Sequence, residues 1–219
     1  MFNKPVKVMR TIKKILKHEK YNDQSMANDI ALLYLERSLP LGKYIQRVTI
    51  RRWHSPNEIA SVAGWGIVNR VTNKDTIHLK RALQKLISPR VCASFGGMFT
   101  GMMCAKSPEK NTSPASGDSG SALITKDMQQ IGLVSYIFSE YPNMPIYTNV
   151  ANEQTASWIR RNSEENVAHR HPQMQIRCLP LINGEEDAQK EDISPSYASP
   201  LPPNPLPRGL KLGLRYHTH

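Results

Sequence analysis

The chain has 219 residues, of which 39% are hydrophobic, and it carries a formal net charge of +11. This length allows one large domain, or a smaller domain followed by a tail. No stretch approaches the roughly 20 consecutive apolar residues of a membrane-spanning helix, so we expect no membrane span. No motif supports nucleic-acid binding. We also expect no cofactor and no metal site.

The positive charge is concentrated in the first three quarters of the chain. Residues 1–163 hold 23 of the 29 lysine and arginine residues but only 11 of the 18 acidic residues. Seven cationic residues lie between Lys4 and Lys20 alone. Such a field attracts acidic proteins or sulfated polymers, and these are candidate partners. A solvated basic strand face is the plainer alternative.

The first predicted element covers residues 12–22. The spacing of its apolar residues fits an amphipathic helix that would bind a membrane surface or a partner: Met9, Ile12, Ile15 and Leu16. We favour a barrel strand, although Lys13-Lys14 interrupts the alternation, so periodicity alone does not decide. Residues 1–7 are charged and lack the apolar core of a signal peptide.

Several short motifs follow in chain order. Asn28-Asp29 precedes an apolar strand over residues 30–35. A glycine-flanked turn, Gly64-Trp65-Gly66, comes next, and residues 117–121 read Gly-Asp-Ser-Gly-Ser. Two further strands are predicted over residues 131–136 and 145–150, and a short helix over residues 157–162.

These motifs resemble, in the same order, those of the trypsin/chymotrypsin-like serine proteases, whose nucleophile stands in Gly-Asp-Ser-Gly. The resemblance covers roughly residues 7–161. It implies an all-β fold of two antiparallel six-stranded barrels with the active site between them. This chain would hold the last part of the first barrel, all of the second, and a short C-terminal helix. We expect this partial protease domain to occupy residues 1–163.

The resemblance also assigns roles to four positions. Ser119 would be the nucleophile, and Asp29 would be the carboxylate that orients a histidine. The backbone N–H groups of Gly117 and Ser119 would form the oxyanion hole. Asp118 would pair with the N-terminal ammonium that zymogen cleavage creates. Without that partner we expect Asp118 to be an uncompensated charge in a loosely ordered loop.

The specificity pocket implied by the resemblance is lined by four residues: Ser113, Ser135, Tyr136 and Ile137. Ser113 would lie at its base, and a neutral base argues against selection for lysine or arginine. Ile137 and Pro145 stand where the family commonly has glycine. Both would narrow the pocket towards small residues or close it.

Three cysteines are present. Cys92 and Cys104 stand where the family has a short-range disulfide, and we predict that they pair. Two further family bridges are absent as complete pairs. One would involve Ala115, and the other would join Ala60 to Thr125. Cys178 lies in the tail, and its state stays open.

The family's general base is a histidine in an Ala-His-Cys segment before the aspartate. Only 28 residues precede Asp29, and none has this context. We interpret His18, His54 and His78 as solvated surface residues. Two hypotheses therefore stay open. One is a secreted serine endopeptidase, acting on polypeptides, whose gene model begins too late. The other is a noncatalytic homologue that binds a protein partner through its basic surface.

Residues 164–219 differ in composition from the rest. They contain eight of the 16 prolines and an acidic run at residues 185–187. Such a segment buries too little apolar surface to offset its conformational entropy, so we predict a disordered tail. A proline-rich docking motif at residues 200–207 is an alternative.

Overall fold

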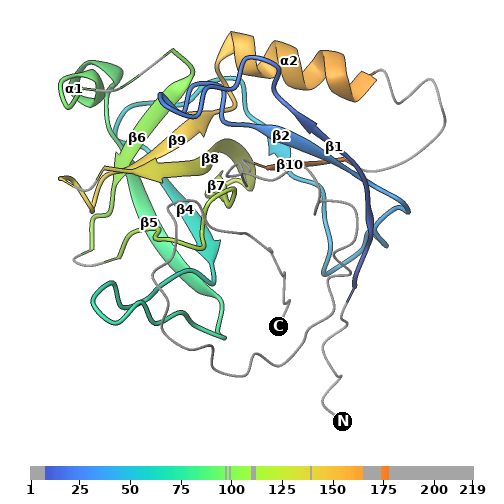
Figure 1. Cartoon of the computed structure of the whole chain (residues 1–219), viewed down its shortest axis with the longest axis horizontal. Coiled ribbons are helices and arrows are strands. Elements are labelled where there is room, and N and C mark those ends of the chain that lie inside the picture. The colour runs from blue at the N-terminus through green and yellow to red at the C-terminus, as the bar shows by residue number, and fades with distance from the viewer. Residues whose placement is uncertain are drawn as a thin grey trace.

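The computed structural model describes residues 8–96, 98, 100–109, 112–138, 140–164 and 174–177. These residues form ten strands and two helices, which confirms the all-β prediction (Figure 1). The strands are β1 (Ile12–Lys17), β2 (Ala31–Leu35), β3 (Thr49–Ile50), β4 (Ile59–Gly64), β5 (Lys80–Leu86), β6 (Met102–Lys106), β7 (Ala122–Thr125), β8 (Gln129–Ile137), β9 (Pro145–Asn149) and β10 (Met174–Arg177). The helices are α1 (Pro89–Ala93) and α2 (Glu153–Glu164). Neither helix has the length and apolar character needed to cross a membrane.

Six strands close into one antiparallel barrel. Its order is β8-β7-β4-β5-β6-β9, and β9 pairs back with β8. β3 adds a short parallel pairing to the outside of β8. Burial alternates along β4, as expected for a strand with one face in a core. The barrel interior is filled mainly by aliphatic side chains, including Val62, Leu86, Leu123, Ile131 and Val134. This is the predicted second barrel.

A three-stranded sheet, in the order β1-β2-β10, stands where we predicted the incomplete first barrel. β1 is a strand, so the amphipathic-helix alternative is wrong. Its pairing register with β2 shifts between Ile12 and Lys14. A bulge at this point explains why Lys13-Lys14 interrupts the alternation of apolar and polar residues.

Within the predicted tail, residues 174–177 form the strand β10. They pair antiparallel with β2, with Met174 opposite Tyr34 and Arg177 opposite Ala31. β2 is buried along its length, so the backbone N–H and C=O groups on its second edge need hydrogen-bond partners. An extended segment supplies these partners. Several residues of the tail lie outside the described residues, namely Cys178, residues 200–207 and the histidines His169, His171, His217 and His219.

One apolar cluster joins the small sheet to the barrel and to α2. Its members come from β2, β8 and α2 and from the residues beside them: Ile30, Leu32, Tyr34, Leu133, Val150, Trp158 and Ile159. The Trp158 Nε1–H donates to Glu19 Oε2 at 2.6 Å, and the Tyr34 hydroxyl donates to the Asn162 carbonyl at 2.7 Å. These contacts fix β2, and with it the preceding Asp29, against the barrel.

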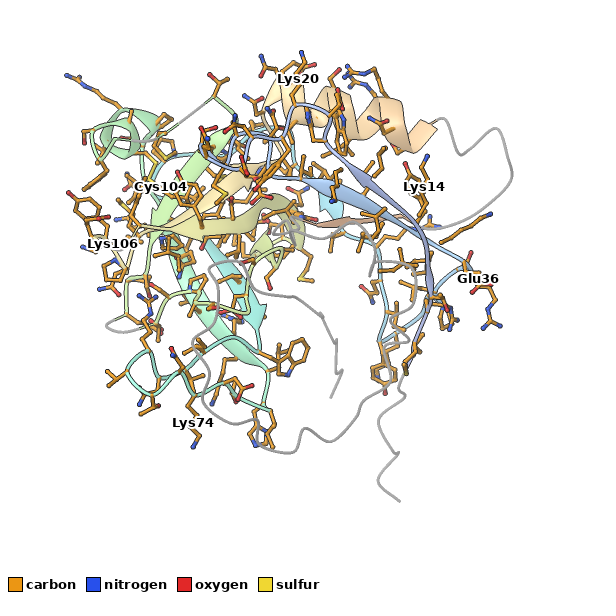
Figure 2. All side chains as sticks on the ribbon, in the orientation of Figure 1. Lys14, Lys20, Glu36, Lys74, Cys104 and Lys106 are labelled. Atoms are coloured by element: carbon orange, nitrogen blue, oxygen red, sulfur yellow. A yellow bond between two sulfur atoms is a disulfide. The ribbon has the colours of Figure 1, made fainter. Side chains whose placement is uncertain are left out.

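The disulfide predicted between Cys92 and Cys104 is confirmed, with Cα atoms 5.9 Å apart (Figure 2). It ties α1 to β6 within a buried apolar cluster. The absent bridge at Ala60 and Thr125 is also informative. These two residues are direct partners in the β4–β7 pairing, so strand hydrogen bonds hold the positions together without a covalent bond.

Candidate active site

Asp29 lies immediately before β2 and is 6% exposed. The Ser135 hydroxyl donates to its Oδ2 at 2.6 Å, and the Thr148 hydroxyl donates to its backbone carbonyl at 2.7 Å. Burial raises the pKa of Asp29 to about 6, while the hydrogen bond from Ser135 acts in the opposite direction. The carboxyl group therefore titrates near pH 6 instead of near its ordinary value of 3.8.

The Gly-Asp-Ser-Gly segment forms a tight loop before β7. Gly117 has φ +97° and Gly120 has φ +79°, in the left-handed region that side chains disfavour. A Cβ atom at Gly117 would also come within 2.9 Å of the Gly66 Cα. Glycine is thus required at Gly117 by conformation and by space. Ser119, between these glycines, is half-buried.

The backbone N–H groups of this loop divide into two kinds. Those of Asp118, Gly120 and Ser121 donate to backbone carbonyls at 3.0, 2.7 and 3.0 Å. Those of Gly117 and Ser119 have no hydrogen-bond partner within the described residues. Two donors that stay available on one loop could bind a carbonyl oxygen or an oxyanion.

Two consecutive residues of β8 hold Asp29 and this loop. The Val134 carbonyl accepts from the Gly120 N–H, and the Val134 N–H donates to the Ser121 carbonyl at 2.9 Å. The next residue, Ser135, donates to Asp29. Ser135 is predicted from the sequence as a pocket residue, and its contact with Asp29 is not. The only signal for that contact is a lone hydroxyl at the end of the apolar run 131–134.

Asp118 turns towards the Gly64-Trp65-Gly66 segment. Its Oδ1 accepts from the Gly66 N–H at 2.8 Å, and its Oδ2 accepts from the Ala115 N–H at 2.9 Å. Burial raises the pKa of Asp118, and these two bonds counter that rise. These two backbone dipoles therefore offset part of the expected uncompensated charge, and burial still has the larger effect on the pKa of Asp118. A looser loop stays a prediction.

The same carboxylate explains both glycines of the turn. A Cβ atom at Gly66 would lie 2.5 Å from the Asp118 Cγ, and one at Gly64 would overlap its Oδ1. Real Cβ atoms do not approach this closely. The Gly-Trp-Gly motif therefore makes room for Asp118.

The four predicted pocket residues lie in two segments. Ser113 precedes the nucleophile loop, and its buried Oγ has no hydrogen-bond partner in the described part of the chain. Ser135, Tyr136 and Ile137 lie at the end of β8. Tyr136 packs edge-on against Phe138, with ring centroids 5.2 Å apart. Their role in specificity stays a prediction.

Two of the three described histidines differ from the expected solvated surface residues. His18 is buried, because the Trp158 ring stacks on it with centroids 4.8 Å apart. Its Nδ1 accepts from the Lys20 N–H at 3.0 Å, and desolvation lowers its pKa. His54 is half-buried, and desolvation lowers its pKa. Only His78 is exposed as expected.

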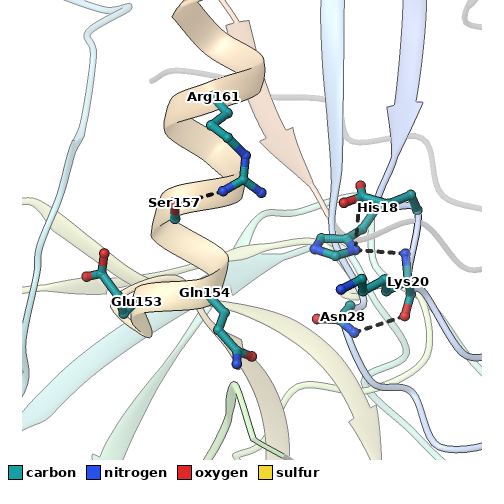
Figure 3. A pocket seen from close by; sticks show the side chains of 8 residues that line it. His18, Lys20, Asn28, Glu153, Gln154, Ser157 and Arg161 are labelled. Atoms are coloured by element: carbon teal, nitrogen blue, oxygen red, sulfur yellow. Dashed lines mark hydrogen bonds and ion pairs between the residues drawn. The ribbon is translucent and has the colours of Figure 1, made fainter.

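A hollow of about 370 Å³ lies between α2 and the turn that carries His18 (Figure 3). The residues that line it are polar or charged, with both signs of charge present, and several of them hydrogen-bond with one another. The Asn28 side-chain amide donates to the Lys20 carbonyl, and Arg161 donates to the Ser157 hydroxyl, both at 2.9 Å. We assign this hollow no part in the candidate site. Within the described residues, no group of His, Cys, Asp or Glu side chains could hold a metal ion.

Comparisons with known proteins agree with this architecture. The family model Trypsin matches residues 3–159. Duodenase-1 of Bos taurus is 32% identical over 154 residues, which cover 68% of this chain and 59% of duodenase-1. Trypsin delta of Drosophila erecta is 31% identical over 156 residues, 67% of this chain and 59% of its own length. The chain thus spans about three fifths of these relatives.

A solved structure agrees in fold. It is neuropsin, a serine protease expressed in the limbic system of mouse brain. It superposes with a TM-score of 0.64 at 24% identity, and the match covers 70% of this chain and 71% of neuropsin.

Proposed function

Because this chain belongs to the trypsin family of serine proteases, we propose that it carries the nucleophile and the orienting carboxylate of a serine endopeptidase. The proposal rests on one observation above all. Consecutive residues of β8 hold the loop of Ser119 and the carboxyl group of Asp29. The N–H groups of Gly117 and Ser119, unpaired within the described part of the chain, support an oxyanion hole on the same loop.

In the proposed reaction the Ser119 Oγ attacks the carbonyl carbon of a peptide bond. A histidine takes the hydroxyl proton, and the N–H groups of Gly117 and Ser119 bind the oxygen of the tetrahedral intermediate. The histidine then gives the proton to the leaving amine, which leaves an acyl group on Ser119. Water releases this group by the same steps. These roles are those of trypsin-like proteases in general, carried over to the matching positions of this chain.

The general base is the part that the described residues do not supply. His18 is buried under Trp158, His54 is half-buried, and His78 is exposed on a loop. We propose that the base comes from a histidine outside the described residues. An imidazolium next to Asp29 would offset its desolvation and lower its pKa, so that the carboxylate is ionised during the reaction.

Features of the chain support a preference for substrates with a small, uncharged side chain before the cleaved bond. They also support an extracellular site of action. Ser113 offers a hydroxyl and no charge, and Ile137 lies opposite Pro145 across β8 and β9. Both features favour a small apolar side chain before the cleaved bond. The Cys92–Cys104 disulfide suits an oxidising compartment.

Covalent labelling tests the proposal. The protein is treated with a small alkyl fluorophosphonate, and the adduct is mapped by mass spectrometry. We expect an adduct on Ser119 that is lost in Ser119→Ala and kept in Ser116→Ala, which alters an exposed serine of the same loop. N-terminal peptides of the native protein, sequenced in the same experiment, reveal any histidine-bearing segment before Met1. A protein that carries this histidine and still leaves Ser119 unlabelled contradicts the proposal.

A noncatalytic binding protein is the second candidate. The burial of His18 under Trp158 favours it, because desolvation disfavours the protonated form that a general base must adopt. Its ligands would be acidic proteins or sulfated polymers, drawn by the exposed lysines of β1, Lys13, Lys14 and Lys17. Retention on immobilised heparin that is weakened when these lysines are neutralised, with no labelling of Ser119, supports this candidate.

A further inference from the structure

Arg70 joins three loops that are far apart in the sequence. It lies in the connection between β4 and β5, where Asn69 and Lys74 form an isolated bridge. Its Nη2 donates to the Pro114 carbonyl at 3.1 Å and to the Pro142 carbonyl at 2.9 Å. These carbonyls lie 44 and 72 residues further along the chain. One guanidinium nitrogen carries two hydrogens in a fixed plane, so it can serve both acceptors.

The two carbonyls belong to the segments that flank the predicted specificity pocket. Pro114 follows Ser113 and leads into the nucleophile loop. Pro142 lies in the loop after Ile137, residues 138–144. Neither segment contains a cysteine. The disulfide that the family has at the position of Ala115 is therefore absent from this chain.

The loop around Pro142 also has contacts of its own, and its ends, Phe138 and Met144, pack in the apolar cluster around Cys92 and Cys104. Within it, the Tyr141 N–H donates to the Phe138 carbonyl at 3.1 Å, and the Met144 N–H donates to the Tyr141 carbonyl at 2.9 Å. The Tyr141 ring meets Phe95 edge-on, at a centroid distance of 4.9 Å. These contacts tie the loop to α1 and β6, and Arg70 ties its Pro142 carbonyl to the connection between β4 and β5.

We propose that Arg70 is a positioning residue that clamps the two walls of the pocket together, in place of a disulfide. A charged donor makes a stronger hydrogen bond than a neutral one, and the planar guanidinium fixes the direction of both bonds. Proline carbonyls suit this role, because the ring fixes φ and so restricts the segment that carries the acceptor. The pocket role rests on the proposed function, whereas the clamp itself does not.

Hydrogen exchange in the full chain tests the clamp. Arg70→Met is compared with Arg81→Met. Arg81 is the second residue of β5, directly after the loop that carries Arg70, and its replacement also removes one positive charge. Arg81 is exposed and has no side-chain hydrogen bond within the described residues. We expect the amides of Met144 and Asp118 to exchange about fivefold faster or more in Arg70→Met, and to change less than about twofold in the control. Equal rates in both variants overturn the clamp.

A second variant, Arg70→Lys, is used if Arg70→Met destabilises the whole domain. If Leu33 of β2 also exchanges much faster in Arg70→Met, the whole domain has been destabilised, and Arg70→Lys decides. Lysine keeps the charge but lacks the planar pair of donors. Faster exchange confined to the segments of Met144 and Asp118 supports the clamp, and its absence overturns it.

Labelling separates the clamp from the proposed function. Two phosphonates, one with a methyl and one with a benzyl side chain, compete for Ser119. Loss of the clamp should let the loop around Pro142 move outwards, so Arg70→Met shifts the labelling ratio severalfold towards the benzyl probe. An unchanged ratio overturns the role in the pocket. If neither probe labels the unaltered protein, the proposed function fails, and hydrogen exchange still decides the clamp.

Discussion

Replacing Asp29 by asparagine should stabilise the chain at neutral pH. The folded state raises the pKa of Asp29 from 3.8 to about 6. Folding therefore favours the protonated form, and stability is lost as the pH rises between these values. Two units at about 1.4 kcal/mol each give a loss of about 3 kcal/mol above pH 6. Asparagine carries no charge, and its amide oxygen can still accept from Ser135.

The assay is urea-induced unfolding followed by tryptophan fluorescence at pH 4 and at pH 7.5. We expect Asp29→Asn to exceed the unaltered chain by about 3 kcal/mol at pH 7.5, or about 6–12 °C in melting temperature, and by less than about 1 kcal/mol at pH 4. Asp127→Asn, which alters an exposed carboxylate in the turn after β7, should show no such difference. A gain of equal size at both pH values, or no gain, refutes the reasoning.

Three further predictions concern the surroundings of the site. Ser135→Ala removes a hydrogen bond that lowers the pKa of the buried carboxyl group, so this pKa should rise in a carbon-13 NMR titration, and a fall contradicts the assignment. Gly66→Ala should cost about 1–3 kcal/mol in denaturant unfolding through overlap with the neighbouring carboxylate. Gly42→Ala, which meets no atom within 4 Å, should cost almost nothing. Replacing Cys92 and Cys104 together by alanine should cost about 3 kcal/mol, and equal melting temperatures with and without reductant contradict this.

Motifs that define a local backbone conformation could be predicted from the sequence. The glycines at 64, 66 and 117 and the strands around them are examples, because each depends on a few neighbouring residues. The hydrogen bond from Ser135 to Asp29 joins residues 106 apart. It could not be predicted, because it depends on how β2 docks against the end of β8. The burial of His18 under Trp158 escaped prediction for the same reason.

The groups that solvate the Asp118 carboxylate also could not be predicted from the sequence. Asp118 was expected to need a cationic partner, since a buried carboxylate without one is costly. The structure gives it two backbone N–H groups from segments that the chain brings together only when the barrel closes. β10 likewise depends on a contact between segments that are far apart in the sequence. Four residues with modest apolar content carry no strong strand signal, and only the available edge of β2 turns them into a strand.

The pairing of β10 with β2 has a consequence for the order of events during synthesis. Ile176 pairs with Leu32, so the ribosome makes almost all of the described chain before the two strands can meet. Until then this edge of β2 can accept a strand from elsewhere, including the same segment of a second molecule. Products that terminate before Met174 would keep that edge open. They should associate with one another more readily than the 219-residue chain does.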